Sequence, residues 1–313
     1  MASGNGLGIE GVVKQLRELR DRSLQSRHRD GRPPRLPSRA TLAEIVAGLA
    51  AAMFPNRLGR PDLTEEGIDH YVGHTLDVAL RSLNEQLNRE LLFTSNLDEL
   101  SDEDAARGLA IVREFAQSLP RIRELLDSDI LAAYQGDPAA RSIDEVLVCY
   151  PGIAAITHYR LANVLYRLGV RLTARMIAEL AHSLTGIDIH PAARIGGSFF
   201  IDHGTGVVIG ETAIIGERVR LYQAVTLGAK RFPVDPSGAL VKGAPRHPIV
   251  EDDVVIYAGA TVLGRVTIGS GSTIGGNVWL TRSVPPGSNV SQAQALTDAV
   301  IGVGVRPDAP APR

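Results

Sequence analysis

The sequence predicts an α+β chain, in which an N-terminal all-helical domain is followed by a left-handed parallel β-helix of hexapeptide repeats. Over residues 41–185 the apolar residues recur at spacings of three and four, the period of one helix face. After Gly186 the period changes to six, which neither a helix nor an ordinary strand produces. Aromatic residues make up only 4% of the chain, which also holds 32 glycines; this favours many tight turns over a large aromatic core.

These observations divide the 313 residues into four parts. We expect a basic, flexible arm over 1–40, the helical domain over 41–185, the β-helix over 186–292 and a C-terminal tail over 293–313. Within the β-helix, residues 229–249 break the six-residue period and predict a long loop excursion that carries several basic residues.

Composition excludes several classes of protein. Acidic residues interrupt the positive charge of the arm, which is more typical of a solvated segment than of a nucleic-acid-binding one. The formal net charge of −2 gives no reason to expect a nucleic-acid or membrane partner, and no apolar run is long enough to span a bilayer. The single cysteine, Cys149, excludes an intrachain disulfide, and its apolar neighbours predict a buried, inert thiol. We therefore expect a cytoplasmic protein.

Capping residues support the helical domain. Pro151 and Pro120 are expected in the first turn of a helix or at a break. Residues suited to helix starts precede several apolar stretches, namely Ser38 or Thr41, Ser101 with Asp104, and Ser142 with Glu145.

The β-helix is predicted from nine six-residue units. In eight of the nine the fifth residue is Ala, Val or Ser, and many units carry Gly in second place. In such a fold three hexads make one triangular coil, the aliphatic and small residues fill its interior, and Gly takes corners with unusual backbone angles. Ile189, Ile195 and Ile201 keep the same period but are offset by two residues. The aliphatic residues that open the nine units are Ile209, Ile215, Leu221, Leu227, Ile256, Val262, Ile268, Ile274 and Leu280.

Several motifs within and before these repeats resemble the signature of the serine O-acetyltransferase family. They read DIHPAARIG, IDHGTGVVIGETAIIG, VTLGAK and APRHPIV. Upstream, GDPAARSIDEVLVCYPGIAAITHYR resembles the end of the helical domain of the same enzymes. The resemblance covers roughly residues 137–290 and is far more specific than the hexads alone, which indicate only the fold and, often, an acyltransferase.

The resemblance implies transfer of the acetyl group of acetyl-CoA to the hydroxyl of L-serine, which gives O-acetyl-L-serine for cysteine biosynthesis. A serine hydroxyl is a weak nucleophile, and an imidazole with a pKa of about 6.5 is suited to take its proton. By resemblance, His203 is the general base and Asp188 orients it. Their separation along the chain is close to the length of one coil of three hexads, so adjacent coils or subunits could place them together.

The two ends of free serine need opposite charges. Its ammonium calls for acids, and its carboxylate calls for a cation with a forked set of donors. By resemblance, Asp137 and Asp202 bind the polar end of the substrate, and Arg246 with His247 bind the carboxylate side. We expect Asp202 and His203 to point out of the prism, toward a site between subunits.

Acetyl-CoA needs a narrow slot with small residues, where backbone groups can approach the pantetheine arm. The resemblance places Gly228, Ala229, Ala258 and Gly276 there. The 3′-phosphate of CoA needs a cation, and the candidates are Lys230, Arg231, Arg265 and Arg282. No metal is expected.

The resemblance also implies a homo-trimer or a dimer of trimers, and L-cysteine as a feedback inhibitor. Many members of the family end in an isoleucine that inserts into the active site of O-acetylserine sulfhydrylase. This chain ends in Arg313, whose charge is costly in an apolar pocket, so a stable complex with the sulfhydrylase is not expected.

Three alternatives remain open from the sequence. The first is an acyltransferase of the same fold with another hydroxyl acceptor, such as a sugar or an antibiotic. The second is a zinc enzyme of the γ-carbonic anhydrase type, for which His182, His190 and His203 would be the ligands, although the usual close histidine pair is not evident. The third is a β-helix scaffold without catalytic activity.

Overall fold

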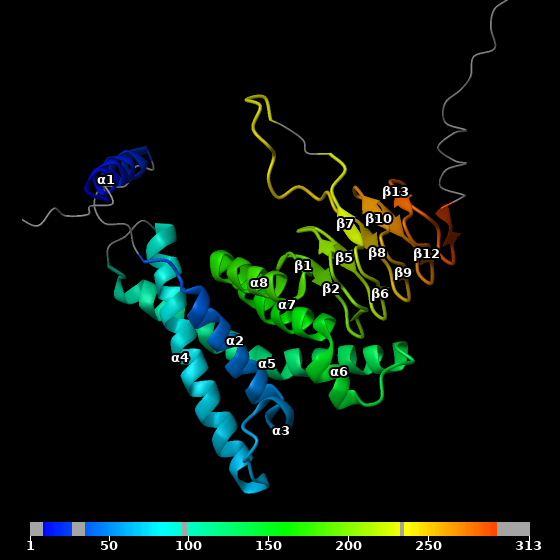
Figure 1. Ribbon diagram of the computed structural model, residues 1–313, viewed down its shortest axis with the longest axis horizontal. Coiled ribbons are helices and arrows are strands. Elements are labelled where there is room, and N and C mark those ends of the chain that lie inside the picture. The colour runs from blue at the N-terminus through cyan, green and yellow to red at the C-terminus, as the bar shows by residue number, and fades with distance from the viewer. Residues whose placement is uncertain (1–8, 27–34, 96–98, 232–234, 293–313) are drawn as a thin grey trace, which may run out of the picture.

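The computed structural model describes residues 9–26, 35–95, 99–231 and 235–292. Its helices come first in the chain and its short parallel strands follow (Figure 1), which confirms the predicted fold class. The C-terminal tail over 293–313, including Arg313, lies outside the described residues.

The helical part packs around a buried apolar core that continues into the β-helix. Ser38, Ser101 and Ser142 are N-caps whose side chains accept a backbone N–H, as the sequence predicts. Pro151 stands in the first turn of its helix. The helices are α1 (Ile9–Ser26), α2 (Arg39–Met53), α3 (Pro55–Leu58), the 3₁₀ turn η1 (Glu65–Gly67), α4 (Ile68–Ser95), α5 (Asp102–Gly136), α6 (Ile143–Cys149), α7 (Pro151–Arg167) and α8 (Arg171–Thr185).

Two local predictions are wrong, those for Pro120 and Cys149. Pro120 lies inside α5, on the exposed side, where water can serve the carbonyl group that the missing N–H leaves free. Cys149 is exposed because it ends the short helix α6, in which only Val146 is buried. The arm contains a helix, α1, whose apolar residues recur at helical spacing and remain exposed, among them Val12, Leu16 and Leu19.

The strands stack into three parallel sheets, which are the three faces of a prism. Sheet A has the order β1-β4-β7-β10-β13, sheet B has β11-β8-β5-β2, and sheet C has β14-β12-β9-β6-β3. The strands are β1 (Asp188–Ile189), β2 (Arg194–Ile195), β3 (Phe200–Ile201), β4 (Val208–Ile209), β5 (Ile214–Ile215), β6 (Arg220–Leu221), β7 (Thr226–Gly228), β8 (Ile249–Val250), β9 (Val255–Ile256), β10 (Thr261–Leu263), β11 (Thr267–Ile268), β12 (Thr273–Ile274), β13 (Trp279–Leu280) and β14 (Asn289–Val290).

The pairing register explains the two-residue offset in the repeat. Asp188 pairs with Val208 and Val208 pairs with Thr226, so the first interval along the chain is longer than the second by two residues. The neighbouring pairs on sheets B and C span the same longer interval, so the two additional residues lie between β3 and β4. The turn that contains Asp202 and His203 is therefore longer than the other turns at this corner.

The excursion likewise appears as one longer interval in the strand pairing, after which the regular repeat resumes. Ile214 pairs with Ile249 and Ile249 pairs with Thr267, and only the second interval has the length of three hexads. The additional residues in the first interval form a loop that leaves the prism between β7 and β8. Figure 1 shows this segment, in yellow, rising from the strands. The coils above the excursion therefore return to the regular repeat.

Glycine residues in the hexads allow neighbouring coils to approach each other closely. A Cβ on Gly216 would lie 2.8 Å from the backbone nitrogen of Asp252 in the next coil, and one on Gly210 would collide with the ring of His247. The corners themselves often carry residues other than glycine in the left-handed region, with φ of 57° at His203 and 58° at Ala224. The expectation that glycine supplies the corner angles is therefore only partly correct.

Candidate functional site

Asp202 and His203 lie in the lengthened turn between sheets C and A, which we name corner C–A. The Asp202 side chain is 15% exposed and that of His203 is 70% exposed, so the histidine points out of the prism. His203 Nδ1 lies 3.7 Å from Asp202 Oδ1. The turn between two apolar strands thus presents an imidazole to the outside of the prism.

The helical domain adds a second carboxylate to this corner. Asp137 is the C-cap of α5; its Oδ1 accepts from the Ala139 N–H at 2.8 Å and its Oδ2 from the Tyr150 hydroxyl at 2.5 Å. The bond from Tyr150 is the main cause that lowers the pKa of Asp137, and the charge of His203 contributes to the same direction. Asp137 is therefore a carboxylate within electrostatic range of His203.

Close packing fixes the helical domain against the first coil. A Cβ on Gly152, in the first turn of α7, would collide with the carbonyl oxygen of Ile201, so only glycine fits there. The residue after Ile201 is Asp202. The contact therefore sets the position of the α6–α7 junction relative to the turn.

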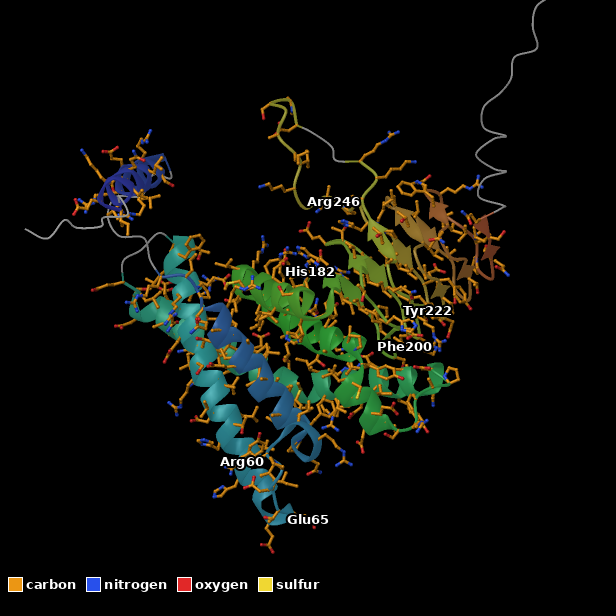
Figure 2. The ribbon with its side chains drawn as sticks, in the orientation of Figure 1. Arg60, Glu65, His182, Phe200, Tyr222 and Arg246 are labelled. Atoms are coloured by element: carbon orange, nitrogen blue, oxygen red, sulfur yellow. The ribbon has the colours of Figure 1, made fainter. Side chains whose placement is uncertain are left out.

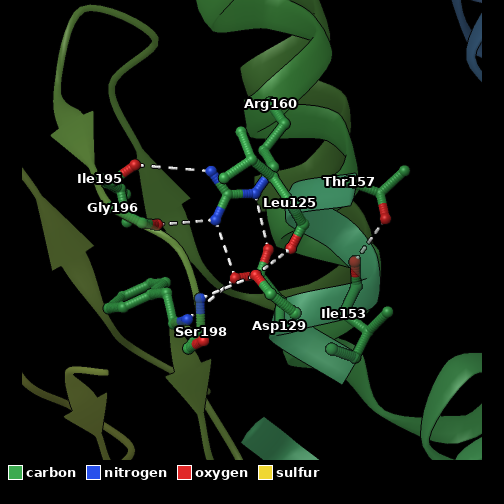
Figure 3. A network of polar contacts seen from close by, with 10 residues as sticks. Leu125, Asp129, Ile153, Thr157, Arg160, Ile195, Gly196 and Ser198 are labelled. Carbon is green, nitrogen blue, oxygen red and sulfur yellow. Dashed lines mark hydrogen bonds and ion pairs between the residues drawn. The ribbon is translucent and has the colours of Figure 1, made fainter. Parts of the chain in front are cut away.

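A buried ion pair extends the same attachment (Figure 3). Arg160 of α7 donates to both oxygens of Asp129 of α5, at 2.6 and 2.8 Å, and its guanidinium also donates to the carbonyl of Gly196 at 2.8 Å. The N–H of Phe199 donates to Asp129 at 2.8 Å. Burial is the largest cause acting on the Asp129 carboxyl and raises its pKa. Two helices and the first coil are joined through these two side chains.

Asp188 begins β1, one coil below the strand that follows His203. Its carboxylate lies within 4.8 Å of the ligand atoms of Glu179 and His182, both on α8. No hydrogen bond or ion pair joins Asp188 to His203 among the residues that the structure describes. The group of Glu179, His182 and Asp188 offers only one histidine, and Glu179 also pairs with Arg175 at 3.2 Å.

Arg246 and His247 lie at a different edge, between sheets A and B, which we name corner A–B. Arg246 Nη2 pairs with Glu211 Oε2 at 2.6 Å, and both side chains are about three-quarters buried. The Thr212 hydroxyl accepts from the N–H groups of Arg246 and His247, at 2.9 and 3.1 Å. Figure 2 shows Arg246 beside the excursion.

His247 is held as a neutral donor. Its Nδ1 accepts from the N–H of Thr212 at 3.0 Å, so the proton of the neutral ring is on Nε2. Burial, followed by the charge of Arg246, lowers the pKa of His247 to about 4. His190 lies in the same electrostatic environment, and burial, followed by the charge of Arg175, lowers its pKa to about 4 as well.

The four small residues predicted for the CoA slot divide between the two corners. Ala258 and Gly276 lie on successive coils of corner C–A, where a Cβ on Gly276 would be 3.3 Å from the Ala258 carbonyl oxygen. Gly228 ends β7 on the side of corner A–B, and Ala229 follows it. A groove at that corner is lined by Arg246 and by three of the candidate phosphate-binding cations, Lys230, Arg231 and Arg265.

One chain cannot bring all these residues to one small substrate. His203 and Arg246 stand at opposite sides of sheet A, and a six-residue face of strand is about 20 Å wide. The structure brings Asp137, Asp202 and His203 together at one corner, and Arg246 with His247 at the other.

Comparison with known proteins places the chain in a family. The family model described as "Bacterial transferase hexapeptide (six repeats)" matches residues 247–282. The plasmid serine acetyltransferase of Synechococcus elongatus is 61% identical over 267 residues, which cover 84% of each chain. The chain belongs to the serine acetyltransferase family.

Solved structures of serine acetyltransferases agree with this membership. Isoform 3 from Entamoeba histolytica, in complex with cysteine, matches with a TM-score of 0.67 and 36% identity over 83% of each chain. A serine acetyltransferase in complex with CoA matches with a TM-score of 0.51 and 26% identity, over 79% of this chain and 95% of that one.

Three residues near the site escaped the sequence analysis. Tyr150 and Asp137 are separated by a turn and a short helix, so no periodicity connects them. Glu211 and Thr212 support Arg246 and His247 from the preceding coil, and the excursion between the two segments hides that neighbourhood. If the residues before and after the excursion had been aligned as neighbouring coils, the sequence would have predicted that these two segments lie side by side.

Proposed function

We propose that this chain transfers the acetyl group of acetyl-CoA to the hydroxyl of L-serine, with His203 as the general base. The observation that carries the proposal is an exposed imidazole in a lengthened turn beside two carboxylates, on a chain of the serine acetyltransferase family. As a member of that family the chain is an acyltransferase that acts on serine with acetyl-CoA as co-substrate.

His203 takes the proton of the serine hydroxyl as the oxygen attacks the thioester carbonyl carbon. A C–O bond forms and gives a tetrahedral intermediate, whose negative oxygen then restores the carbonyl as the C–S bond breaks. The imidazolium returns the proton to the departing CoA thiolate. The products are O-acetyl-L-serine and CoA, and the histidine is neutral again.

The pairing of Asp188 with His203 belongs to the proposal. Asp188 lies at the edge of sheet A next to the lengthened turn, and the His203 side chain is exposed beside it. A carboxylate at Nδ1 would fix the tautomer that keeps Nε2 free to accept the hydroxyl proton and would stabilise the imidazolium.

The substrate is proposed to lie between corners of two chains. Asp137 and Asp202 of one chain face the serine ammonium, and Arg246 with the neutral His247 of a neighbour face the carboxylate. A guanidinium and an Nε2–H donor suit a carboxylate. The CoA slot divides in the same way, with Lys230, Arg231 and Arg265 near the phosphate.

A cyclic trimer supplies such a pairing three times, because each chain then offers one corner to each neighbour. Pairing of two trimers through the helical domains to give a hexamer is a further proposal. L-cysteine, which keeps both charged ends of serine, is proposed to compete with it. The absence of a stable complex with the sulfhydrylase and the cytoplasmic location also remain predictions. No helix among the described residues could span a membrane.

A thiol-release assay with acetyl-CoA tests the reaction. We expect release with L-serine and none above background with a galactoside or an aminoglycoside. Release with either of those acceptors and none with serine would favour an acyltransferase of the same fold with another substrate.

A further inference from the structure

We propose that Tyr150 is a positioning residue for the serine ammonium, and that it acts through the carboxylate of Asp137. The inference rests on the proposed function. Its basis is the 2.5 Å hydrogen bond from the Tyr150 hydroxyl to Asp137 Oδ2, at the corner that also carries Asp202 and His203.

The backbone of Tyr150 is fixed from both sides. It is the C-cap of α6, through the bond from its N–H to the Val146 carbonyl at 3.2 Å. It is also the N-cap of α7, since its own carbonyl accepts from the N–H groups of Ile153 and Ala154, at 3.1 and 3.3 Å. Gly152 then seats the same junction on the Ile201 carbonyl. The hydroxyl is therefore held at a fixed place relative to the turn of His203.

Asp137 without this bond would be free to turn. It ends a helix, and the only other hydrogen bond that its carboxylate makes with the described residues is the one that Oδ1 accepts from the Ala139 N–H. With Tyr150 on Oδ2, both oxygens are fixed, and each keeps a lone pair for a ligand. A carboxylate held in this way loses less conformational freedom when it binds an ammonium group.

The charged groups that act on Asp137 agree with this role. His203 from the turn and Arg220 from β6 both favour the ionised form of Asp137, and the hydrogen bond from Tyr150 favours it most. The same bond, together with burial and the charges of Asp137, Glu145 and Asp202, raises the pKa of Tyr150 to about 12. The tyrosine therefore stays a protonated donor throughout the working pH range.

The test compares Tyr150→Phe with Tyr134→Phe, a control on α5 that removes the hydroxyl of a partly exposed tyrosine. Loss of a hydrogen bond to a charged group should raise the KM for L-serine about tenfold in Tyr150→Phe, while the KM for acetyl-CoA and kcat change little. The control should behave as the parent. An unchanged serine KM in Tyr150→Phe, or an equal rise for both substrates, would overturn the proposal.

Two further measurements separate positioning from a structural role. In an Asp137→Asn background, Tyr150→Phe should add little, because the two effects would share one cause. The kcat/KM for 3-hydroxypropionate, which lacks the ammonium, should not fall in Tyr150→Phe. Additive effects, or equal losses for both acceptors, would contradict the inference. Failure of the parent protein to acetylate serine would instead refute the proposed function.

Discussion

His203 occupies a left-handed corner, with a φ of 57°, in a turn that is two residues longer than its counterparts. That geometry places the imidazole outside the prism, where it is 70% exposed, without disturbing the apolar residues on either side. The side chain of His203 and the stacking of the coils are therefore separable, and a substitution at this position should leave the fold intact.

Replacing His203 with Ala should lower turnover by about two to four orders of magnitude, the usual contribution of a general base, while CoA binding and unfolding stay unchanged. Steady-state thiol release, calorimetric titration with CoA and a denaturation curve check the three parts. Near-normal turnover would remove His203 from this role.

Acid should destabilise the protein through His190 and His247. Burial, the first cause in both, lowers each pKa to about 4, whereas the unfolded chain takes up these protons near pH 6.5. Stability is therefore lost progressively as pH falls from about 6.5 to about 4. The charges facing the two rings are those of Arg175, Glu211, Arg246 and Arg265.

Urea titrations at pH 7.5 and pH 5 measure this loss. The double variant His190→Gln, His247→Gln should show a smaller difference between the two pH values than the parent. An equal difference would assign the acid sensitivity to other groups.

At the scale of elements, the ion pair of Arg160 with Asp129 joins α7, α5 and the first coil. Arg160→Met should cost about 3–5 kcal/mol of unfolding free energy, because it leaves a buried carboxylate unpaired. Asp129→Leu in the same chain should recover part of that loss. Urea unfolding of the single and double variants measures both effects. A double variant no more stable than the single one would show that the bonds to the Gly196 carbonyl and from the Phe199 N–H matter more than the unpaired charge.

The sequence predicted elements better than the contacts between them. Hexads identify the strands and the inward residues because the same six-residue environment recurs, and caps identify helix starts because they act over three residues. The proposed role of Tyr150 depends on a hydrogen bond across a turn, and the exposure of Cys149 depends on where α6 ends. Neither depends on a local period, so neither could be predicted from one.

At the scale of the whole molecule, the site is proposed to be shared between chains, and co-expression of two impaired variants tests this. Arg246→Ala should raise the KM for serine, and His203→Ala should lower turnover by about two to four orders of magnitude. In a mixed trimer, one interface pairs an intact corner C–A with an intact corner A–B. Activity at low serine should therefore exceed that of either variant alone.

The control for this experiment carries both substitutions on one chain and is co-expressed with the His203→Ala chain. It should stay inactive, because no chain then offers an intact corner C–A. A mixture of the single variants that never exceeds its parents would show that each chain completes its own site.

Corner C–A has one more consequence, which concerns length. Asp202, Tyr222 and Tyr257 occupy equivalent places on successive coils, and the two tyrosine rings stack with centroids 5.0 Å apart. Neighbouring parallel strands are about 4.8 Å apart, so groups at equivalent places on this edge are separated by whole multiples of that spacing. An extended cofactor bound along this edge would therefore meet equivalent groups at regular intervals of one coil. Removing one regular coil of three hexads would move each upper contact by a full step while leaving every remaining side chain intact.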